Sequence, residues 1–252
     1  MARESLVEGQ EGTEEMDPEK VPSEAERIRK TYREVRKTVP RDLYCFMNPD
    51  VVLASCSRDI TLLAGLRKFI SPDQFKQARI LDLGCGTGAF LGRLLQYGAD
   101  PSLITGLDLL PESLLKAQRQ YPHVPLVCGD GSLLPFRDNS FDIVWQSTVF
   151  TSILHDSTKR QMAREIVRVL KQGGYVWWFD FMYNNPRNPD VKGIKPSEIR
   201  QLFPHTLFWC RKCVLAPPLA RLLAPYSVKL CQVLEWIPWL RTHCVAILKV
   251  AK

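Results

Sequence analysis

A short glycine-rich stretch at residues 80–90, ILDLGCGTGAF, constrains the fold of this chain more than any other feature. An apolar run breaks into glycines at Gly84, Gly86 and Gly88, and apolar residues then resume at helical spacing. This order predicts a strand, a tight turn and a helix, because a backbone without Cβ atoms turns tightly and lets a ligand approach closely. The helix that follows directs unsatisfied N–H groups at the same spot, so the turn favours an oxygen-rich ligand.

The glycines alone do not select the ligand, because Gly84, Gly86 and Ala89 also satisfy a loose dinucleotide-binding fingerprint. Asp82 argues against a bound pyrophosphate, since like charges repel in a partly desolvated site. A carboxylate at this place suits an ammonium group instead. S-adenosylmethionine carries an ammonium, a sulfonium and a ribose, and it has no phosphate.

Four segments in register resemble the motifs of class I S-adenosylmethionine-dependent methyltransferases, in particular the ubiquinone and menaquinone type. They are DLGCGTG at 82–88, GLDLL at 106–110, CGDGSLLPF at 128–136 and REIVRVLKQGGYVWW at 164–178. The resemblance covers residues 45–182 well and the remainder loosely. It implies S-adenosyl-L-methionine as the cofactor and a Rossmann-like α/β fold. That fold is a mostly parallel seven-stranded sheet with its last strand antiparallel and with helices on both faces.

Periodicity independently predicts alternating strands and helices. Strands are expected near 79–84, 102–108, 124–128, 140–146, 174–181 and 206–215, and helices near 24–38, 49–69, 88–97, 111–120 and 157–171, the last ended by Gly173-Gly174. Residues 242–250 resemble the last, antiparallel strand of the family. An alternation of strands and helices forms a parallel sheet covered on both faces, which binds ligands at the carboxyl ends of its strands where the winding reverses. Asp82, Asp108, Asp130 and Gln146 all fall at those ends.

The resemblance assigns roles to several of these residues. Asp108 is expected to accept hydrogen bonds from the ribose hydroxyls, Asp130 from the adenine amino group, and Asp82 to face the methionine ammonium. Leu109 and Leu133 would enclose the adenine ring. The residues expected to bind the cofactor are Asp82, Gly84, Cys85, Gly86, Gly88, Asp108, Leu109, Asp130, Gly131 and Gln146.

The acceptor side of the site is less constrained by sequence. His155 follows the fourth expected strand and Tyr183 the fifth, in regions that face the acceptor in the resembled family. Both are candidate catalytic residues, because a hydroxyl acceptor must lose a proton, and either could equally be a cap or a packing residue. The family's motif for amino methylation, N/D-P-P-Y/F, is absent at residues 146–148, which read QST. Methylation of a nucleobase amino group is therefore disfavoured.

The chain divides into three predicted parts. Residues 1–21 are polar and acidic and are expected to form a disordered tail. Residues 22–70 are predicted to be an N-terminal helical lid, and residues 71–252 the S-adenosylmethionine-binding methyltransferase domain. Tyr44 and Arg58 are candidates to line the pocket beneath the lid, although ordinary packing and surface charge explain each of them as well.

Charge and composition leave the partner open. The net charge is +7, and residues 1–20 hold seven acids and two bases, a net of −5, so the remainder carries +12. Such a surface attracts nucleic acid, anionic lipid or a phosphorylated substrate, and a solvated basic exterior is the simpler interpretation. There is no strong nucleic-acid signal, since the aromatic residues do not interleave with the basic run in a recognisable RNA-binding motif. The apolar, proline-broken segment 217–240 is expected to pack on the sheet, with a dimer contact or a lipid surface as alternatives.

The eight cysteines are scattered, and no signal peptide or apolar run long enough to span a membrane is evident. We therefore expect reduced thiols in a cytoplasmic protein. One pair, Cys210-x-x-Cys213, is a weak metal signal, and its alternating neighbours favour a strand, so no metal is expected. The sequence thus predicts methyl transfer to a small-molecule acceptor, such as a metabolite, glycan or lipid precursor, by a monomer or homodimer. An RNA methyltransferase and a non-catalytic S-adenosylmethionine-binding protein are the alternatives.

Overall fold

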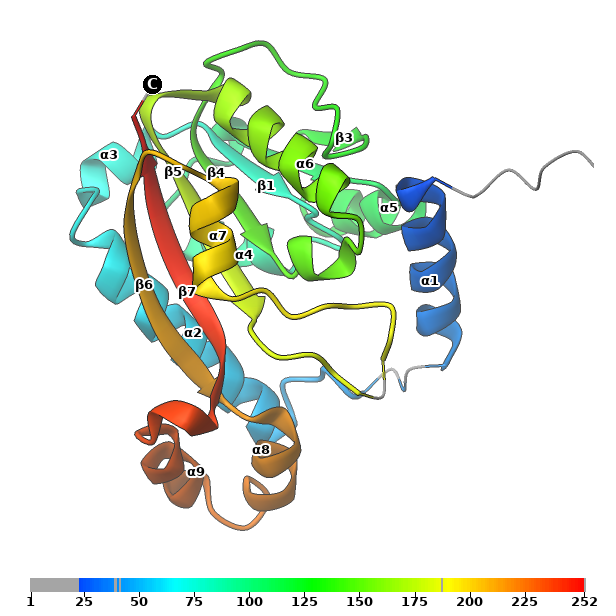
Figure 1. The fold of residues 1–252 in the computed structure, drawn as a ribbon, viewed down its shortest axis with the longest axis vertical. Helices are drawn as coiled ribbons and strands as arrows, with labels where there is room; N and C mark the ends of the chain where they lie inside the picture. The colour runs from blue at the N-terminus through cyan, green and yellow to red at the C-terminus, as the bar shows by residue number, and fades with distance from the viewer. Residues whose placement is uncertain (1–22, 39, 41, 187, 252) are drawn as a thin grey trace, which may run out of the picture.

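A single seven-stranded sheet organises the computed structural model, which describes residues 23–38, 40, 42–186 and 188–251 (Figure 1). The strands are β1 (Ile80–Leu83), β2 (Ile104–Asp108), β3 (Leu126–Cys128), β4 (Phe141–Ser147), β5 (Leu170–Phe181), β6 (Thr206–Leu215) and β7 (Arg241–Val250). Their order is β3-β2-β1-β4-β5-β7-β6. Six of these strands run in one direction, and β7 runs in the opposite direction between β5 and β6. The predicted fold is confirmed. The acidic tail expected at residues 1–21 lies outside the described residues.

The winding of this sheet reverses next to β1. The chain proceeds from β1 outward to β2 and β3, and then returns to place β4 on the other side of β1. All of these pairs are parallel, so the carboxyl ends of β1, β2 and β4 share one edge of the sheet. This edge is where open α/β sheets bind their ligands.

Helices cover both faces of the sheet (Figure 1). They are α1 (Glu24–Thr38), α2 (Pro49–Leu66), α3 (Pro72–Lys76), α4 (Ala89–Gln96), α5 (Pro111–Gln120), α6 (Asp156–Val169), α7 (Pro196–Leu202), α8 (Pro217–Leu223) and α9 (Val228–Glu235), with 3-10 turns η1 (Pro101–Leu103), η2 (Phe150–Ser152) and η3 (Pro238–Leu240). The short helix α3 was not predicted. A capping box starts it, in which the Ser71 hydroxyl accepts from the Gln74 N–H and the Gln74 side chain accepts from the Ser71 N–H.

The prediction that Gly173-Gly174 ends the helix expected at 157–171, which is α6 in the structure, is wrong. The helix already ends at Val169, and Leu170 pairs with Phe141 as the first residue of β5. Two residues further along β4 the partner is Tyr175, so the register shifts and residues 171–174 bulge out of the ladder. Glycine signals a break in regular structure, but it does not distinguish a helix end from a bulge.

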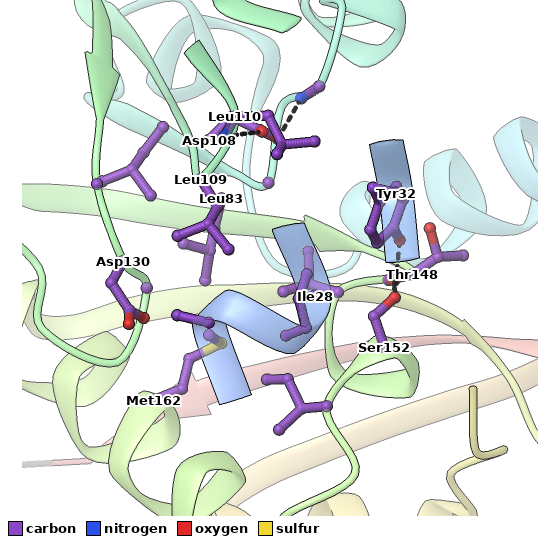
Figure 2. A pocket seen from close by; sticks show the side chains of 18 of the residues that line it. Ile28, Tyr32, Leu83, Asp108, Leu109, Leu110, Asp130, Thr148, Ser152 and Met162 are labelled. Carbon is purple, nitrogen blue, oxygen red and sulfur yellow. Dashed lines mark hydrogen bonds between the residues drawn. The ribbon is translucent and has the colours of Figure 1, made fainter. Parts of the chain in front are cut away.

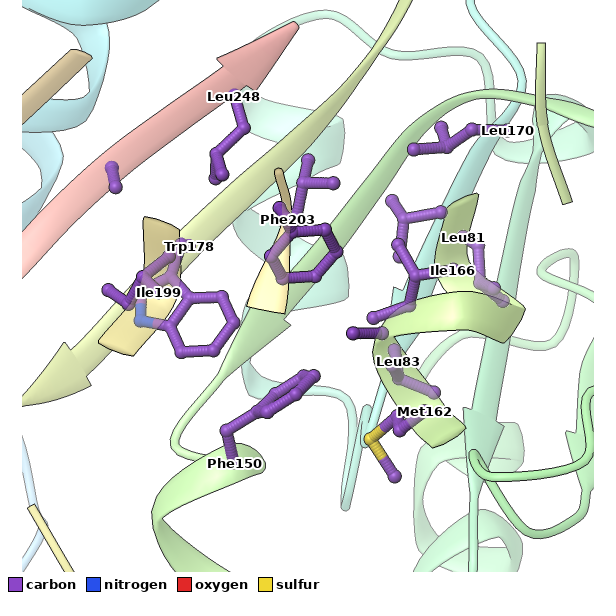
Figure 3. Packing of buried hydrophobic residues seen from close by; sticks show 14 of the residues in the cluster. Leu81, Leu83, Phe150, Met162, Ile166, Leu170, Trp178, Ile199, Phe203 and Leu248 are labelled. Atoms are coloured by element: carbon purple, nitrogen blue, oxygen red, sulfur yellow. The ribbon is translucent and has the colours of Figure 1, made fainter. Parts of the chain in front are cut away.

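Two apolar layers, one on each face of the sheet, form the core. On one face Trp178 packs against Phe150 and Phe203, with ring centroids 4.5 and 6.1 Å away (Figure 3). On the other face Phe90 of α4 stacks on Trp145 of β4 at 3.8 Å. Neighbouring residues of a strand point to opposite faces, which is why the adjacent Trp177 and Trp178 belong to different layers. These layers hold the strand ends in fixed relative positions.

The N-terminal helices α1 and α2 lie in different places. Helix α2 packs against β6 and β7 and against α8 and α9, toward the β6 edge of the sheet and away from α5 (Figure 1). Helix α1 lies beside α5, to which it is joined by an ion pair between Arg33 Nε and Glu112 Oε1 at 3.1 Å. Within the described residues, no helix is both long and apolar enough to cross a membrane.

Candidate functional site

A cavity of about 220 Å³ lies at the carboxyl ends of β1, β2 and β4 (Figure 2). Five groups of residues from the sheet side and α6 line it. They are Leu83, Gly84 and Gly86 at the end of β1, Leu107–Leu110 and Ser113 around the end of β2, Gly129–Gly131 after β3, Ser147–Val149, Ser152 and Ile153 from the end of β4 onward, and Thr158 and Met162 of α6. Helix α1 contributes Glu24, Ala25, Ile28 and Tyr32. The cavity therefore occupies the point where the winding of the sheet reverses.

Two glycines of the β1–α4 turn serve the cavity in different ways. Gly84 and Gly86 both have a positive φ, of 72° and 56°. A Cβ atom at Gly84 would lie 2.4 Å from Val149 Cγ2, so this glycine lets the chain after β4 approach closely. A Cβ atom at Gly86 would meet no atom within 4 Å, because it would project into open space at the cavity wall. Gly86 thus leaves room for a ligand rather than for the protein.

Asp108, the last residue of β2, ties the two neighbouring turns together. Its Oδ2 accepts a hydrogen bond from the Gly86 N–H at 2.8 Å, and its Oδ1 accepts one from the Leu110 N–H at 2.9 Å. Hydrogen bonds to a charged acceptor contribute about 1.5–3 kcal/mol. The carboxylate lines the cavity with its orientation fixed by these bonds (Figure 2).

Asp82 lies in the middle of β1, behind the glycine turn, and its carboxyl group is buried. Its Oδ2 has no hydrogen-bond partner among the described residues. Burial and the charge of Asp108 raise the pKa of Asp82 to about 8. A buried acceptor without a partner is costly, so the structure holds an unsatisfied carboxyl group beside the cavity.

Asp130 and Leu109 line the cavity as the sequence predicts, and Leu133 does not. The Asp130 Oδ1 accepts hydrogen bonds from both the N–H and the hydroxyl of Ser132, each at 2.8 Å. The same turn closes with the Leu133 N–H bonded to the Asp130 carbonyl, and the Leu133 side chain is 76% exposed outside the cavity. Leu110 lines the cavity and was not expected to.

Three of the residues expected to bind the cofactor do not line the cavity, namely Cys85, Gly88 and Gln146. Cys85 is buried among the apolar residues of the α4 layer, and burial raises the pKa of its thiol. Gly88 is the N-cap of α4. Gln146 is fully buried at the end of β4. None of the three belongs to the cavity lining, so each would act on a ligand through the turn that it supports.

Gln146 belongs to a buried polar network that shapes the acceptor side of the cavity. Its amide Nε2 donates to Asp180 Oδ2 at 3.1 Å, and its Oε1 accepts from the Val149 N–H at 3.2 Å. The Thr151 hydroxyl donates to Asp180 Oδ1 at 2.6 Å. Burial raises the pKa of Asp180 to about 7, although the hydrogen bonds from Thr151 and Gln146 oppose the rise. The network fixes the segment after β4, part of which lines the cavity; the sequence reasoning did not identify Asp180 or Thr151.

The two predicted catalytic residues lie outside the cavity lining. His155 is the N-cap of α6, its side chain is 58% exposed, and its Nδ1 lies 3.8 Å from Glu24 Oε2. Tyr183 follows β5 and its side chain is about half exposed. Catalytic contact of either residue stays a prediction. Tyr44 is exposed, and the Arg58 guanidinium lies over the rings of Phe90 and Phe179 in the α4 layer, so neither lines the cavity.

Helix α1 covers the cavity with its apolar stripe. Ile28 and Tyr32 line the cavity, and the Tyr32 hydroxyl is hydrogen-bonded to Ser152 Oγ at 2.8 Å (Figure 2). Burial raises the pKa of Tyr32, with a smaller opposing effect from that hydrogen bond. Helical periodicity in the sequence marks Ile28 and Tyr32 as one stripe, but it does not say which surface the stripe meets.

Hydrogen bonds of charged side chains attach α1 to residues 152–154, which follow β4. The Glu24 carboxylate accepts from the Leu154 N–H, and Arg27 Nη2 donates to the Ser152 carbonyl at 2.6 Å. Arg27 also pairs with Glu24 through its Nε at 2.9 Å. Burial alone would raise the pKa of Glu24, but the hydrogen bonds from Arg27 and Leu154 lower it overall. The carboxylate of Glu24, the first residue of α1, is therefore held in its charged form where the helix meets the chain after β4.

The cysteine pair Cys210 and Cys213 is divided between the two faces of β6. Cys210 packs against the α6 layer, and Cys213 is buried in the α4 layer. Among the described residues, no group of three or more His, Cys, Asp and Glu side chains is arranged to hold a metal ion.

Comparison with known proteins agrees with this geometry. Residues 81–178 match the family model of a methyltransferase domain. The chain is 36% identical over 129 residues to a phthiotriol/phenolphthiotriol dimycocerosates methyltransferase of Mycobacterium ulcerans, covering 49% of this chain and 45% of that protein. It is 31% identical over 129 residues to a demethylmenaquinone methyltransferase of Chlorobaculum parvum, covering 51% of each.

A solved S-adenosylmethionine-dependent methyltransferase from Mesorhizobium loti has the same fold, with a TM-score of 0.54 and 18% identity over 74% of this chain and 96% of that one. Together these findings show that residues 81–178 are similar to a methyltransferase domain and that the chain has the fold of solved S-adenosylmethionine-dependent methyltransferases. The chain spans about half the length of the two curated relatives.

The raised pKa of Asp82 leads to a prediction about stability. Because the folded-state pKa is about 8 and the ordinary value is 3.8, this group stabilises the fold fully below pH 4 and progressively less as the pH rises through 8. The Asp82→Asn variant keeps a neutral group of the same shape. Between pH 5 and pH 9 the free energy of unfolding of the wild type is expected to fall by about 4 kcal/mol more than that of the variant, since the loss extends over about three pH units. Urea unfolding at both pH values measures this difference, and parallel pH profiles would contradict it.

Proposed function

We propose that this chain is a methyltransferase that transfers the methyl group of S-adenosylmethionine to a small-molecule acceptor, such as a metabolite, glycan or lipid precursor. The observation that carries the proposal is the carboxylate of Asp108, which is held by two backbone N–H groups in the wall of the cavity next to the open face of Gly86. The names of the two relatives, which refer to phthiotriol/phenolphthiotriol dimycocerosates and to demethylmenaquinone, support a small-molecule acceptor.

The residues around the cavity fit the cofactor chemically. Asp108 and Asp130 present carboxylates to the cavity, where they can accept hydrogen bonds from ribose hydroxyls and an adenine amino group. The unpartnered Oδ2 of Asp82 would gain a partner from an ammonium group, directly or through water. The open face of Gly86 admits a ligand against the backbone. When bound, the cofactor supplies a methyl group already activated by a positively charged sulfur.

The protein's own contribution is then position and exclusion of water. The carboxylates orient the cofactor, and α1 covers the mouth with Ile28 and Tyr32. Displacement reactions gain from reactants held in line, and a covered site excludes competing water. The hydroxyl groups of Tyr32, Thr148 and Ser152 line the cavity, where they bond to one another or to the backbone, and each oxygen can accept a further hydrogen bond from the acceptor. His155, beside Glu24, and Tyr183, beyond β5, stay our proposed candidates for proton transfer from it.

Two alternatives belong to other functional classes. An RNA methyltransferase would exploit the positive charge outside the N-terminal tail, and RNA binding that weakens steeply with salt would favour it. A binding protein without chemistry would keep the cofactor and transfer nothing. No described residue favours either alternative specifically. We also propose a cytoplasmic location, which the eight free cysteines support, and either a monomer or a homodimer.

Methyl transfer is tested with the full chain, methyl-labelled S-adenosylmethionine and separate metabolite, lipid and RNA fractions of a cell extract. Label is expected in a small-molecule fraction, and Asp108→Ala is expected to weaken cofactor binding about tenfold or more, because it removes hydrogen bonds to a charged group. Calorimetry with S-adenosylhomocysteine measures that affinity. Asp108→Asn, which keeps one acceptor oxygen, and Asp73→Ala, on the distant helix α3, are the controls. Label confined to RNA, or unchanged affinity in Asp108→Ala, would contradict the proposal.

The role of α1 as a lid gives a separate expectation. Arg27→Ala removes the hydrogen bond to the Ser152 carbonyl and the ion pair with Glu24, both at the edge of the cavity. The variant is expected to release S-adenosylhomocysteine several-fold faster, because the cover opens more often. Lys30→Ala, an exposed position on the same helix, is the matched control. Equal release rates for the two variants in a competition experiment would mean that α1 is fixed structure.

A further inference from the structure

The segment after β6 exposes large apolar side chains that folding alone would bury. It comprises α8, α9 and η3, residues 217–240, and it forms one end of the molecule (Figure 1). Its exposed large residues include Leu222, Tyr226, Leu230, Val233, Trp236 and Trp239. The two tryptophans are 77% and 76% exposed, which is unusual for the largest apolar side chain.

The side of this segment that faces the protein already has an apolar core of its own. Its buried members are Ala220, Ala224 and Cys231, which pack with Leu215 at the end of β6, and partly buried leucines pack against them, namely Leu219, Leu223, Leu234 and Leu240. An ordinary amphipathic helix pair has large apolar residues on its inner side alone. Here large apolar residues lie on the outer side as well. The outer apolar surface is therefore available to something outside the chain.

The charge on this surface is positive. Lys229 is exposed within the segment, as is Arg221, whose Nε lies 3.7 Å from Asp50 Oδ2 of α2, and Arg211 and Lys212 are exposed on the adjoining part of β6. The acidic residue of the segment, Glu235, is turned inward, where its Oε1 accepts from the Val214 N–H at 3.0 Å and is bonded to the Ser57 hydroxyl. Exposed tryptophan and tyrosine interspersed with lysine and arginine are typical of protein surfaces that lie in a membrane interface.

The position of the segment relates it to the cavity. Strand β6 runs antiparallel to β7, and β7 runs antiparallel to β5, so β6 points in the same direction as β5 and the other parallel strands. Helix α8 begins at Pro217, directly after the carboxyl end of β6. The apolar, positively charged surface therefore extends from the same edge of the sheet at which the cavity lies.

We propose that the surface formed by α8, α9 and η3 docks onto an anionic lipid bilayer as a peripheral membrane site. The apolar side chains would enter the interface, and the basic residues would pair with anionic lipid headgroups. A second copy of the chain fits this surface less well, because a two-fold contact would bring the basic residues of the two copies together. Docking concerns binding alone and does not depend on the proposed methyl transfer.

Sedimentation of the full chain with lipid vesicles tests the proposal. Binding is expected to vesicles of phosphatidylcholine with about a third phosphatidylglycerol, and to be at least tenfold weaker with phosphatidylcholine alone or at high salt. The double variant Trp236→Ser/Trp239→Ser is expected to lose binding about tenfold or more, with an unchanged melting temperature, because both side chains are exposed. Lys229→Glu should weaken binding to the anionic vesicles specifically.

Leu115→Ser/Leu207→Ser is the matched control, since both leucines are similarly exposed on α5 and β6, outside the segment, and this variant should bind as the wild type does. Equal binding of the wild type and the tryptophan double variant would overturn the proposal. A wild-type dimer in light scattering that the same double variant converts to monomer would also overturn it, in favour of a contact between copies.

Discussion

The site depends on one interaction, the acceptance by Asp108 of hydrogen bonds from the Gly86 and Leu110 N–H groups. It joins the turn after β1 to the turn after β2, which parallel pairing has already placed side by side. Burial raises the pKa of its neighbour Asp82 and the charge of the same carboxylate raises it further, so one charge both organises the loops and acts on the buried acid behind them. Backbone geometry and electrostatics at this edge of the sheet are therefore inseparable.

The parts of the site that lie on the sheet could be predicted from sequence, because a strand end fixes where a residue lies. Asp108 and Asp130 line the cavity since they end or follow parallel strands, and Gly84 and Gly86 adopt the expected turn conformation. Gln146 also ends a strand, but its side chain points into the core and bonds to Asp180. Strand order therefore places a residue at the correct edge without deciding which face its side chain meets.

The parts that cross between elements could not be predicted. Tyr32 belongs to a visible apolar stripe, yet only the tertiary structure brings it to Ser152, 120 residues away in sequence. The network of Asp180, Thr151 and Gln146 joins β5, the turn η2 and β4 through side chains whose partners no local pattern specifies. The exposed Trp236 and Trp239 follow the same principle, since composition marks the segment as apolar and only the fold reveals which of its large residues face outward.

The central claim is that the cavity at the ends of β1, β2 and β4 holds the cofactor, and hydrogen exchange of the full chain with and without S-adenosylhomocysteine tests it most directly. The account predicts that binding slows exchange at residues 83–90, 107–110 and 129–133, with a smaller effect across α1. These segments are far apart in sequence and meet only at the cavity. Protection confined to other segments, or none at saturating ligand, would contradict the account.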